Sequence, residues 1–152
     1  MATIFCDSFA VILTNFREGK RTVTTSYYKA VLQKLKTVLA RKQRGNLHLD
    51  VLFYHGNAPA HSSRTVKTVS REFRSDVIPQ PPSPDLAPSD FFLFLKLKEH
   101  LKGRLLESVD DVKRAVSTWY NTYPPRFYKE GLRRWTYRLQ KCPEVDGRYV
   151  EK

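Results

Sequence analysis

Two short stretches of this sequence contain side chains that can ligate metal ions or transfer protons, at positions where active sites tend to form. His55 to His61, H-G-N-A-P-A-H, directly follows an apolar run typical of a strand. Ser83 to Asp90, S-P-D-L-A-P-S-D, ends where a helix is expected to begin. In α/β sheets, ligands bind beyond the carboxyl ends of the strands, so both stretches are candidates. Asp90 can bind a metal ion, or it can satisfy free N–H groups at the helix start; the residue types favour the second role.

The histidines and cysteines give weaker signals. His55 and His61 are able to ligate a metal ion, but no cluster of Cys or Asp completes a site around them, which favours a structural role. Phosphate-binding glycine loops, G-x-S-x-G and H-E-x-x-H are all absent from the sequence. Cys6 and Cys142 have neither metal-site spacing nor a disulfide framework. Together with the absence of a signal peptide, this predicts an intracellular protein, nuclear or cytoplasmic.

The charge of the chain favours a polyanionic partner, nucleic acid first. The 152 residues carry a formal net charge of +12, and 41% of them are hydrophobic, enough for one folded domain. The two basic regions, 14–74 and 91–152, flank an acidic, proline-rich segment. No apolar run is long enough to span a membrane. The candidate phosphate-binding residues, which can equally be solvated helix faces, are Lys34, Lys36, Arg41, Lys42, Arg44, Arg64, Lys67 and Arg71.

The apolar spacing predicts the order β-β-α-β-α-β-α-α-α, which is typical of an α/β sheet with helices on both faces. The run V-L-F-Y does not alternate, so this strand is expected to be covered on both faces. Ser108 and Asp111 have the spacing of a helix capping box. The predicted strands are 3–6, 10–13, 50–55 and 77–78, and the predicted helices begin near 26, 62, 89, 108 and 127.

The two stretches together resemble the mariner branch of the Tc1/mariner transposases, in which H-D-N-A-R-P-H and Y-S-P-D-L-A-P-S-D-Y are typical. The resemblance continues through F-L-K-L-K-E-H-L-K-G-R and S-V-D-D-V-K-R-A-V to Gln140-Lys141-Cys142, and it covers nearly the whole chain. It implies a ribonuclease H-like fold in which three carboxylates hold two Mg²⁺ or Mn²⁺ ions for DNA cleavage and strand transfer. In some relatives a similar domain is fused to a SET methyltransferase domain, which is not expected in this chain.

The resemblance also locates what this sequence lacks. The second carboxylate of the family matches Gly56, which has no side-chain ligand, and the third matches Asp90. The first lies upstream of the segment that contains Asp7, so we predict Asp7 to be a turn residue of the hairpin. At most Asp90 then remains as a metal ligand, and no metal cofactor is expected in this chain, because one carboxylate cannot hold two hydrated Mg²⁺ ions.

The same comparison predicts a single, incomplete domain over residues 1–152. Its first central strand, the helix-turn-helix DNA-reading domain and the clamp loop are all expected to be missing. The strands around Ile4 and Leu52 would then either leave unpaired backbone groups or pair with each other. A homodimer remains open, although the missing clamp loop would weaken it.

The sequence is compatible with three functions. The chain is expected to be a degenerate transposase domain, a pseudoenzyme with non-specific, salt-sensitive DNA binding. The first alternative is a domesticated, non-catalytic module for DNA binding or protein interaction. The second is an active metal-dependent nuclease that uses Asp7, Asp90 and a neighbouring acid such as Asp85.

Overall fold

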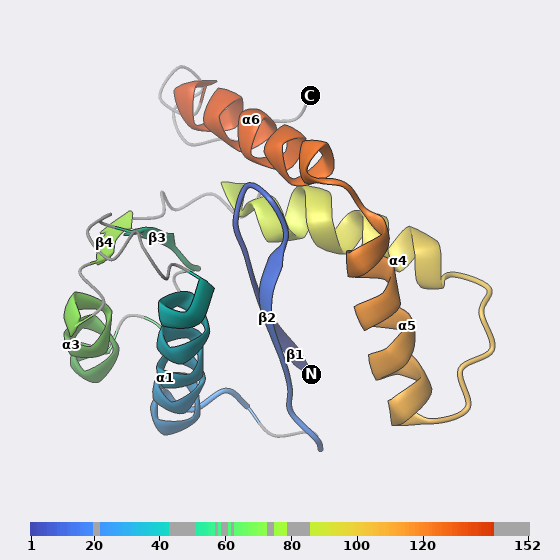
Figure 1. Cartoon of the computed structure of the whole chain (residues 1–152), viewed down its shortest axis with the longest axis horizontal. Coiled ribbons are helices and arrows are strands. Elements are labelled where there is room, and N and C mark those ends of the chain that lie inside the picture. Colours follow the sequence, from blue (N-terminus) through green and yellow to red (C-terminus); the bar gives the residue numbers. More distant parts are fainter. Residues whose placement is uncertain are drawn as a thin grey trace. The chain divides into compact units, whose positions relative to one another are not determined.

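The predicted order of helices and strands is confirmed. A computed structural model of the chain describes residues 1–19, 22–42, 51–56, 58, 61, 63–72, 75–78 and 86–141 (Figure 1). Its elements are β1 (Ala2–Cys6), β2 (Val11–Phe16), α1 (Thr25–Lys42), β3 (Val51–Tyr54), α3 (Arg64–Glu72), β4 (Ser75–Ile78), the π-helix η2 (Ser89–Leu93), α4 (Phe94–Leu101), α5 (Val109–Thr122) and α6 (Pro125–Lys141). They form two compact units: unit 1 is Met1–Phe5 with Asn15–Gln80, and unit 2 is Cys6–Thr14 with Pro81–Lys152.

The β1–β2 hairpin confirms the prediction for Asp7. One carboxylate oxygen of Asp7, Oδ1, accepts hydrogen bonds from the backbone N–H groups of Phe9 at 2.7 Å and Ala10 at 2.9 Å. The Asp7 N–H in turn donates to the Ala10 carbonyl at 3.0 Å. An aspartate that bonds the backbone two and three residues ahead stabilises a tight turn. Asp7 therefore closes the hairpin turn, and β2 runs three residues further than its apolar core predicted.

Unit 1 is built on two helices that pack against each other, α1 and α3. The predicted apolar face of α1 buries Tyr28, Val31, Leu32 and Leu35, and α3 buries Val66 and Val69. Each helix begins at a hydroxyl side chain: Thr24 Oγ1 accepts from the Tyr27 N–H, and Ser63 Oγ accepts from the Val66 N–H, both at 3.3 Å. Gly45, the predicted end of α1, lies outside the described residues.

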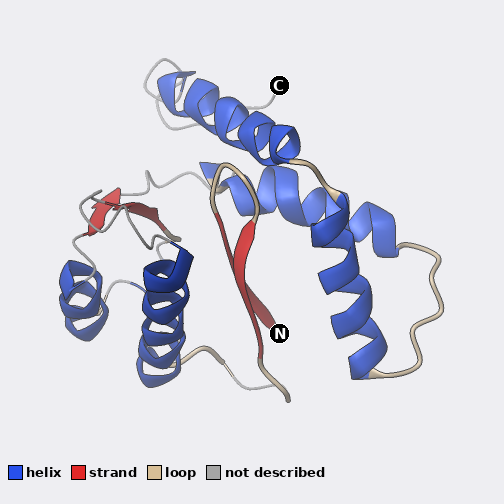
Figure 2. Cartoon of the chain, in the orientation of Figure 1, coloured by secondary structure: helices blue, strands red, loops and turns tan. Residues whose placement is uncertain are grey.

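The strands of the described residues form two separate two-stranded sheets, drawn in red in Figure 2. β1 pairs with β2, and β3 pairs with β4 in parallel, with Phe53 opposite Val77. The alternative pairing of Ile4 with Leu52 does not form among the described residues. The two sheets meet in unit 1 through side chains, because the Phe5 and Phe53 rings stack with their centroids 6.0 Å apart.

The prediction that β3 is covered on both faces is wrong. Phe53 is buried, but Leu52, whose side chain points to the opposite face of the strand, is 69% exposed. One face of the two-stranded β3–β4 sheet therefore has no covering layer among the described residues. For this reason the unbroken apolar run V-L-F-Y forms a strand that is buried on one face only.

Unit 2 is mainly helical. The capping box at the start of α5 is confirmed: Ser108 Oγ accepts from the Asp111 N–H at 3.1 Å, and the Asp111 carboxylate accepts from the Ser108 N–H at 3.1 Å. Of the predicted apolar face, Val116 and Trp119 are buried, whereas Val109 is 63% and Val112 37% exposed. The first turn of α5 therefore extends beyond the helices that cover the rest of its face.

Helix α6 packs against η2 at a glycine. Gly131 is buried, and a β-carbon at this position would lie 2.7 Å from Cδ1 of Phe92. The Phe92 ring also contacts Phe127 of α6, with centroids 4.7 Å apart. Arg138 adds a cation–π contact, since its guanidinium lies 4.1 Å from the centroid of the Phe91 ring. The Arg134 guanidinium also lies over the Phe92 ring, 5.5 Å from its centroid, so four residues of α6 contact the π-helix that carries Asp90.

None of the described helices is long and apolar enough to cross a membrane.

Candidate functional site

Gly56 lies two residues beyond the end of β3, close to the strand end that the sequence predicted. It contributes no side chain, and its carbonyl oxygen accepts a hydrogen bond from Nδ1–H of His61 at 3.1 Å. This bond requires the proton of a neutral His61 to sit on Nδ1, which leaves Nε2 as the acceptor. The backbone oxygen at this position is therefore already engaged within unit 1.

The two histidines belong to an aromatic stack, which supports the structural role predicted for them. The His61 ring stacks on Tyr28 at 4.0 Å between centroids, and the His55 ring stacks on Phe53 at 5.0 Å. The two imidazoles lie 5.4 Å apart. Burial, with a smaller contribution from His61, lowers the pKa of His55 to about 4, and burial also lowers the pKa of His61. Both rings are therefore neutral at pH 7.

Asp90 lies in the π-helix η2, in unit 2. π-helical turns are rare and frequently mark functional sites. The Asp90 N–H donates to the Ala87 carbonyl at 2.9 Å. The N-cap of η2 is Pro88, which makes no side-chain cap hydrogen bond, and Asp90 lies in the first turn, where the helix dipole favours an acid. Partial burial raises the pKa of the Asp90 carboxyl, and Lys98 opposes this effect. Asp90 is exposed, and it would have to be ionised to ligate a metal ion.

A site for two ions needs several oxygen ligands at one place. In the part of the chain that the structure describes, no three His, Cys, Asp or Glu side chains gather closely enough to hold a metal ion. Gly56 has no side chain, Asp7 is engaged in its turn, and Asp85 lies outside the described residues. The described side chains do not fit a two-ion centre.

The basic residues predicted from the sequence lie on two packed helices of unit 1. Helix α1 carries Lys34, Lys36, Arg41 and Lys42, and helix α3 carries Arg64, Lys67 and Arg71. All seven residues are exposed. Arg44 lies outside the described residues. On α3 the three residues follow i, i+3, i+7 and therefore share one face. Lys34 donates to Asn15 Oδ1 at 3.1 Å. Arg41, Arg64, Lys67 and Arg71 form no ion pair with any residue that the structure describes.

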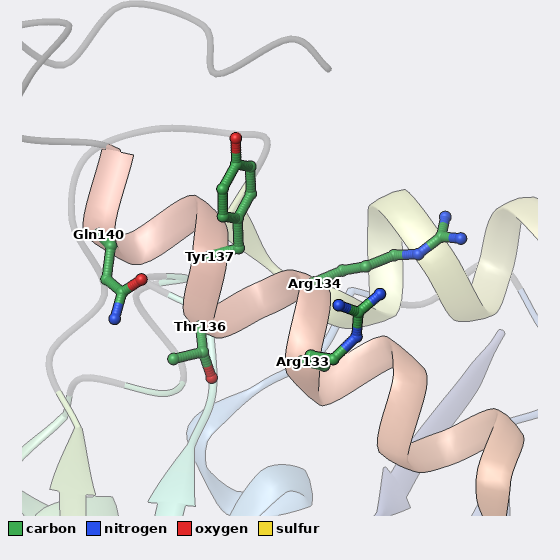
Figure 3. Close-up of a pocket in the computed structure, with 5 residues that line it drawn as sticks. All are labelled: Arg133, Arg134, Thr136, Tyr137 and Gln140. Carbon is green, nitrogen blue, oxygen red and sulfur yellow. The ribbon is translucent and has the colours of Figure 1, made fainter.

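A third basic helix, α6 in unit 2, carries none of the candidate basic residues named from the sequence. It carries six Lys or Arg residues and a single acid, Glu130. A shallow pocket of about 560 Å³ on this helix is lined, among the described residues, by Arg133, Arg134, Thr136, Tyr137 and Gln140 (Figure 3). The signal was present in the sequence as arginines and an aromatic residue spaced three and four residues apart on one helix.

Comparison with known proteins gives the chain its family. Residues 1–49 match the family described as transposase (partial DDE domain). The chain is 32% identical to the mariner Mos1 transposase of Drosophila mauritiana over 155 residues, which cover 99% of this chain and 45% of that protein. It is 26% identical to the human histone-lysine N-methyltransferase SETMAR, covering 99% of this chain and 22% of that protein. The chain thus spans less than half the length of either relative.

Solved structures agree with these sequence matches. The Mos1 catalytic domain with raltegravir and Mg superposes with a TM-score of 0.89 at 32% identity, covering 97% of this chain and 75% of that one. The Mos1 paired-end complex with Mn gives a TM-score of 0.90 at 32% identity, covering 97% and 44%. The fold is therefore that of a transposase catalytic domain of the ribonuclease H-like type, as predicted. Mg and Mn in the Mos1 structures also agree with the expectation that relatives use divalent ions. The chain belongs to the mariner family of transposases.

Proposed function

We propose that this chain is a mariner transposase catalytic domain that no longer cuts DNA and that binds DNA without sequence preference through its basic helices. The observation that carries the proposal is Gly56, which stands where the family resemblance places the second carboxylate. Glycine supplies no ligand oxygen from its side chain, and His61 already bonds its carbonyl. Loss of cleavage then follows from the ligand count rather than from small changes of geometry.

Asp90 alone does not replace the lost ligands. Mg²⁺ gives up its bound water reluctantly and is held by several hard oxygen atoms. Two-ion catalysis needs carboxylates that bridge both ions, so that one ion activates the attacking oxygen while the other stabilises the leaving oxygen. An exposed carboxylate that belongs to no cluster of three metal-binding side chains among the described residues offers at most a weak, mostly hydrated contact.

DNA binding is supported by the exposed cations of α1 and α3. Phosphate contacts release condensed counterions, so each contact contributes about 0.9 to the slope of log K against log salt on duplex DNA. Arg64 and Lys67 lie on one exposed face of α3, are not consumed by ion pairs within the described residues, and are the best single pair to test. Mos1, a relative, has been solved in paired-end complexes, with Mn and with the left transposon end.

The test combines binding with a cleavage assay on the whole chain. A labelled duplex of about 30 base pairs is titrated at several salt concentrations, first without metal and then with Mg²⁺ or Mn²⁺. We expect sequence-tolerant binding, no nicking or joining with either ion, and a slope about 1.8 smaller for Arg64→Gln/Lys67→Gln. The matched control is Lys96→Gln/Arg114→Gln, which removes two exposed cations that are already paired with Glu99 and Asp111.

Two results would contradict the proposal. Metal-dependent cleavage that disappears in Asp90→Ala would support the active nuclease instead. An equal loss of binding in the α3 variant and in the control would mean that only net charge matters and that α3 is not an interface.

The domesticated module stays a second candidate, because the chain is similar over almost its whole length to a human protein named for a different activity, a histone-lysine methyltransferase. Such a module would discriminate between DNA sequences or would ignore DNA altogether. Competition of bound labelled duplex by unrelated duplexes of the same length separates it from the first proposal, which expects equal competition by all of them.

A further inference from the structure

We infer that the outer face of α6 is a separate nucleic-acid contact in unit 2, where Arg133 and Arg134 hold phosphate groups and Tyr137 stacks on a base of a single strand. The inference deepens the proposed function and rests on it for the class of partner. It concerns residues that are not among the candidate phosphate-binding residues named from the sequence.

The α6 face combines exposed cations with an exposed aromatic ring. The side chains of Arg133 and Arg134 are 77% and 57% exposed, and Tyr137 is 52% exposed. In Figure 3 the two arginine side chains extend in the same direction while Tyr137 stands out from the helix. Lys141 lies over the Tyr137 ring, with its Nζ 4.8 Å from the centroid, and adds positive charge beside the aromatic surface.

Glu130 orders the two guanidinium groups without using all their donors. It accepts from Nε and Nη2 of Arg133 at 2.9 and 3.0 Å, and from Nε of Arg134 at 2.8 Å. These bonds engage one edge of Arg133 and leave both terminal amino groups of Arg134 outside the carboxylate contact. The arginine pair is therefore held side by side with donors still directed to solvent. Preorganised guanidinium groups lose less entropy when they bind phosphate.

The chemistry of this face fits a single strand better than a duplex. A paired base cannot expose its ring face to Tyr137, whereas bases of a single strand stack on aromatic side chains regardless of sequence. Arg133 and Arg134, one helical turn before the ring, would contact the backbone phosphates, and aromatic rings combined with cations are the usual composition of single-strand binding surfaces. Binding of duplex phosphates by surface cations alone would not require an exposed tyrosine beside them.

The inference is tested with the whole chain and a labelled oligothymidine of about 15 residues. The arginine variant is Arg133→Gln/Arg134→Gln, which we expect to lower the salt slope by about 1.4 and the affinity at 0.1 M salt about 20-fold. Tyr137→Leu should lower the affinity at least about fivefold with the slope unchanged, because stacking releases no counterions. Glu130→Gln should tighten binding, since it removes the carboxylate that competes with phosphate. The control is again Lys96→Gln/Arg114→Gln.

The outcomes separate this inference from the proposed function. If oligothymidine binding is the same in wild type, the arginine variant and Tyr137→Leu, the α6 contact is wrong, while duplex binding that depends on α3 leaves the proposed function intact. If the α6 variants lose single-strand binding but the α3 variant keeps duplex binding, the inference stands and the α3 assignment fails. Binding of neither nucleic acid by wild type overturns both. Circular dichroism of each variant verifies that the helices remain folded.

Discussion

Replacing Gly131 by alanine will destabilise unit 2, although alanine is the better helix former. The added β-carbon would lie 2.7, 3.0 and 3.4 Å from Cδ1, Cε1 and Cγ of the Phe92 ring. Carbon atoms in contact prefer about 3.5–4.0 Å, so the ring must move by close to 1 Å. It cannot do so freely, because Phe92 is only 8% exposed and packs against Phe127.

Two opposing effects set the magnitude. Overpacking of a filled core costs about 1–3 kcal/mol. Exchange of glycine for alanine inside a helix contributes about 1 kcal/mol in the opposite direction. The net expectation is a loss of about 1 kcal/mol in the free energy of unfolding. It should come with a shift of η2, the π-helix that carries Asp90.

Urea unfolding followed by circular dichroism and by tryptophan fluorescence measures this loss. Thr136→Ala, at an exposed position of the same helix, controls for helix propensity alone and should have little effect. Phe92→Leu should cost less in the Gly131→Ala background than in wild type, because the smaller side chain relieves the clash. A Gly131→Ala protein that is as stable as wild type, or more stable, would refute this account of the α6–η2 contact.

Three further predictions concern stability. Ser108→Ala should cost about 1 kcal/mol in urea unfolding, because it removes the capping hydroxyl, and Ser108→Gly should cost less. Tyr128→Phe should cost about 1 kcal/mol, since the Tyr128 hydroxyl donates to the buried Tyr120 carbonyl at 2.8 Å; an unchanged midpoint would contradict it. The folded pKa of His55, about 4, lies below the unfolded value of 6.5, so stability should be full above pH 6.5 and fall towards pH 4. The fall should be about 2 kcal/mol, because solvent screening of the partly exposed ring reduces the full effect of the shift. His55→Phe should flatten that pH dependence, and an equally steep profile would exclude His55 as its cause.

Local interactions in this protein could be predicted from the sequence because they depend on neighbours along the chain. The capping box of Ser108 and Asp111, the turn at Asp7 and the buried face of α1 all follow from residue types at fixed spacing. The lack of a side-chain ligand at Gly56 is also a property of the sequence, because no fold can give glycine a carboxylate.

Other features depended on contacts between distant segments. The apolar run of β3 predicted a strand covered on both faces, but coverage depends on which elements pack against it, and Leu52 remains exposed. The π-helix at Asp90 forms where Phe91 and Phe92 pack on α6, and no local rule distinguishes it from an ordinary helix start. Glu130 and its two arginines lie close in sequence, but whether they face solvent or a core was decided by how α6 packs on Phe92. The sequence by itself thus determined the side-chain chemistry and the local turns, while tertiary packing decided which of those side chains are free to bind.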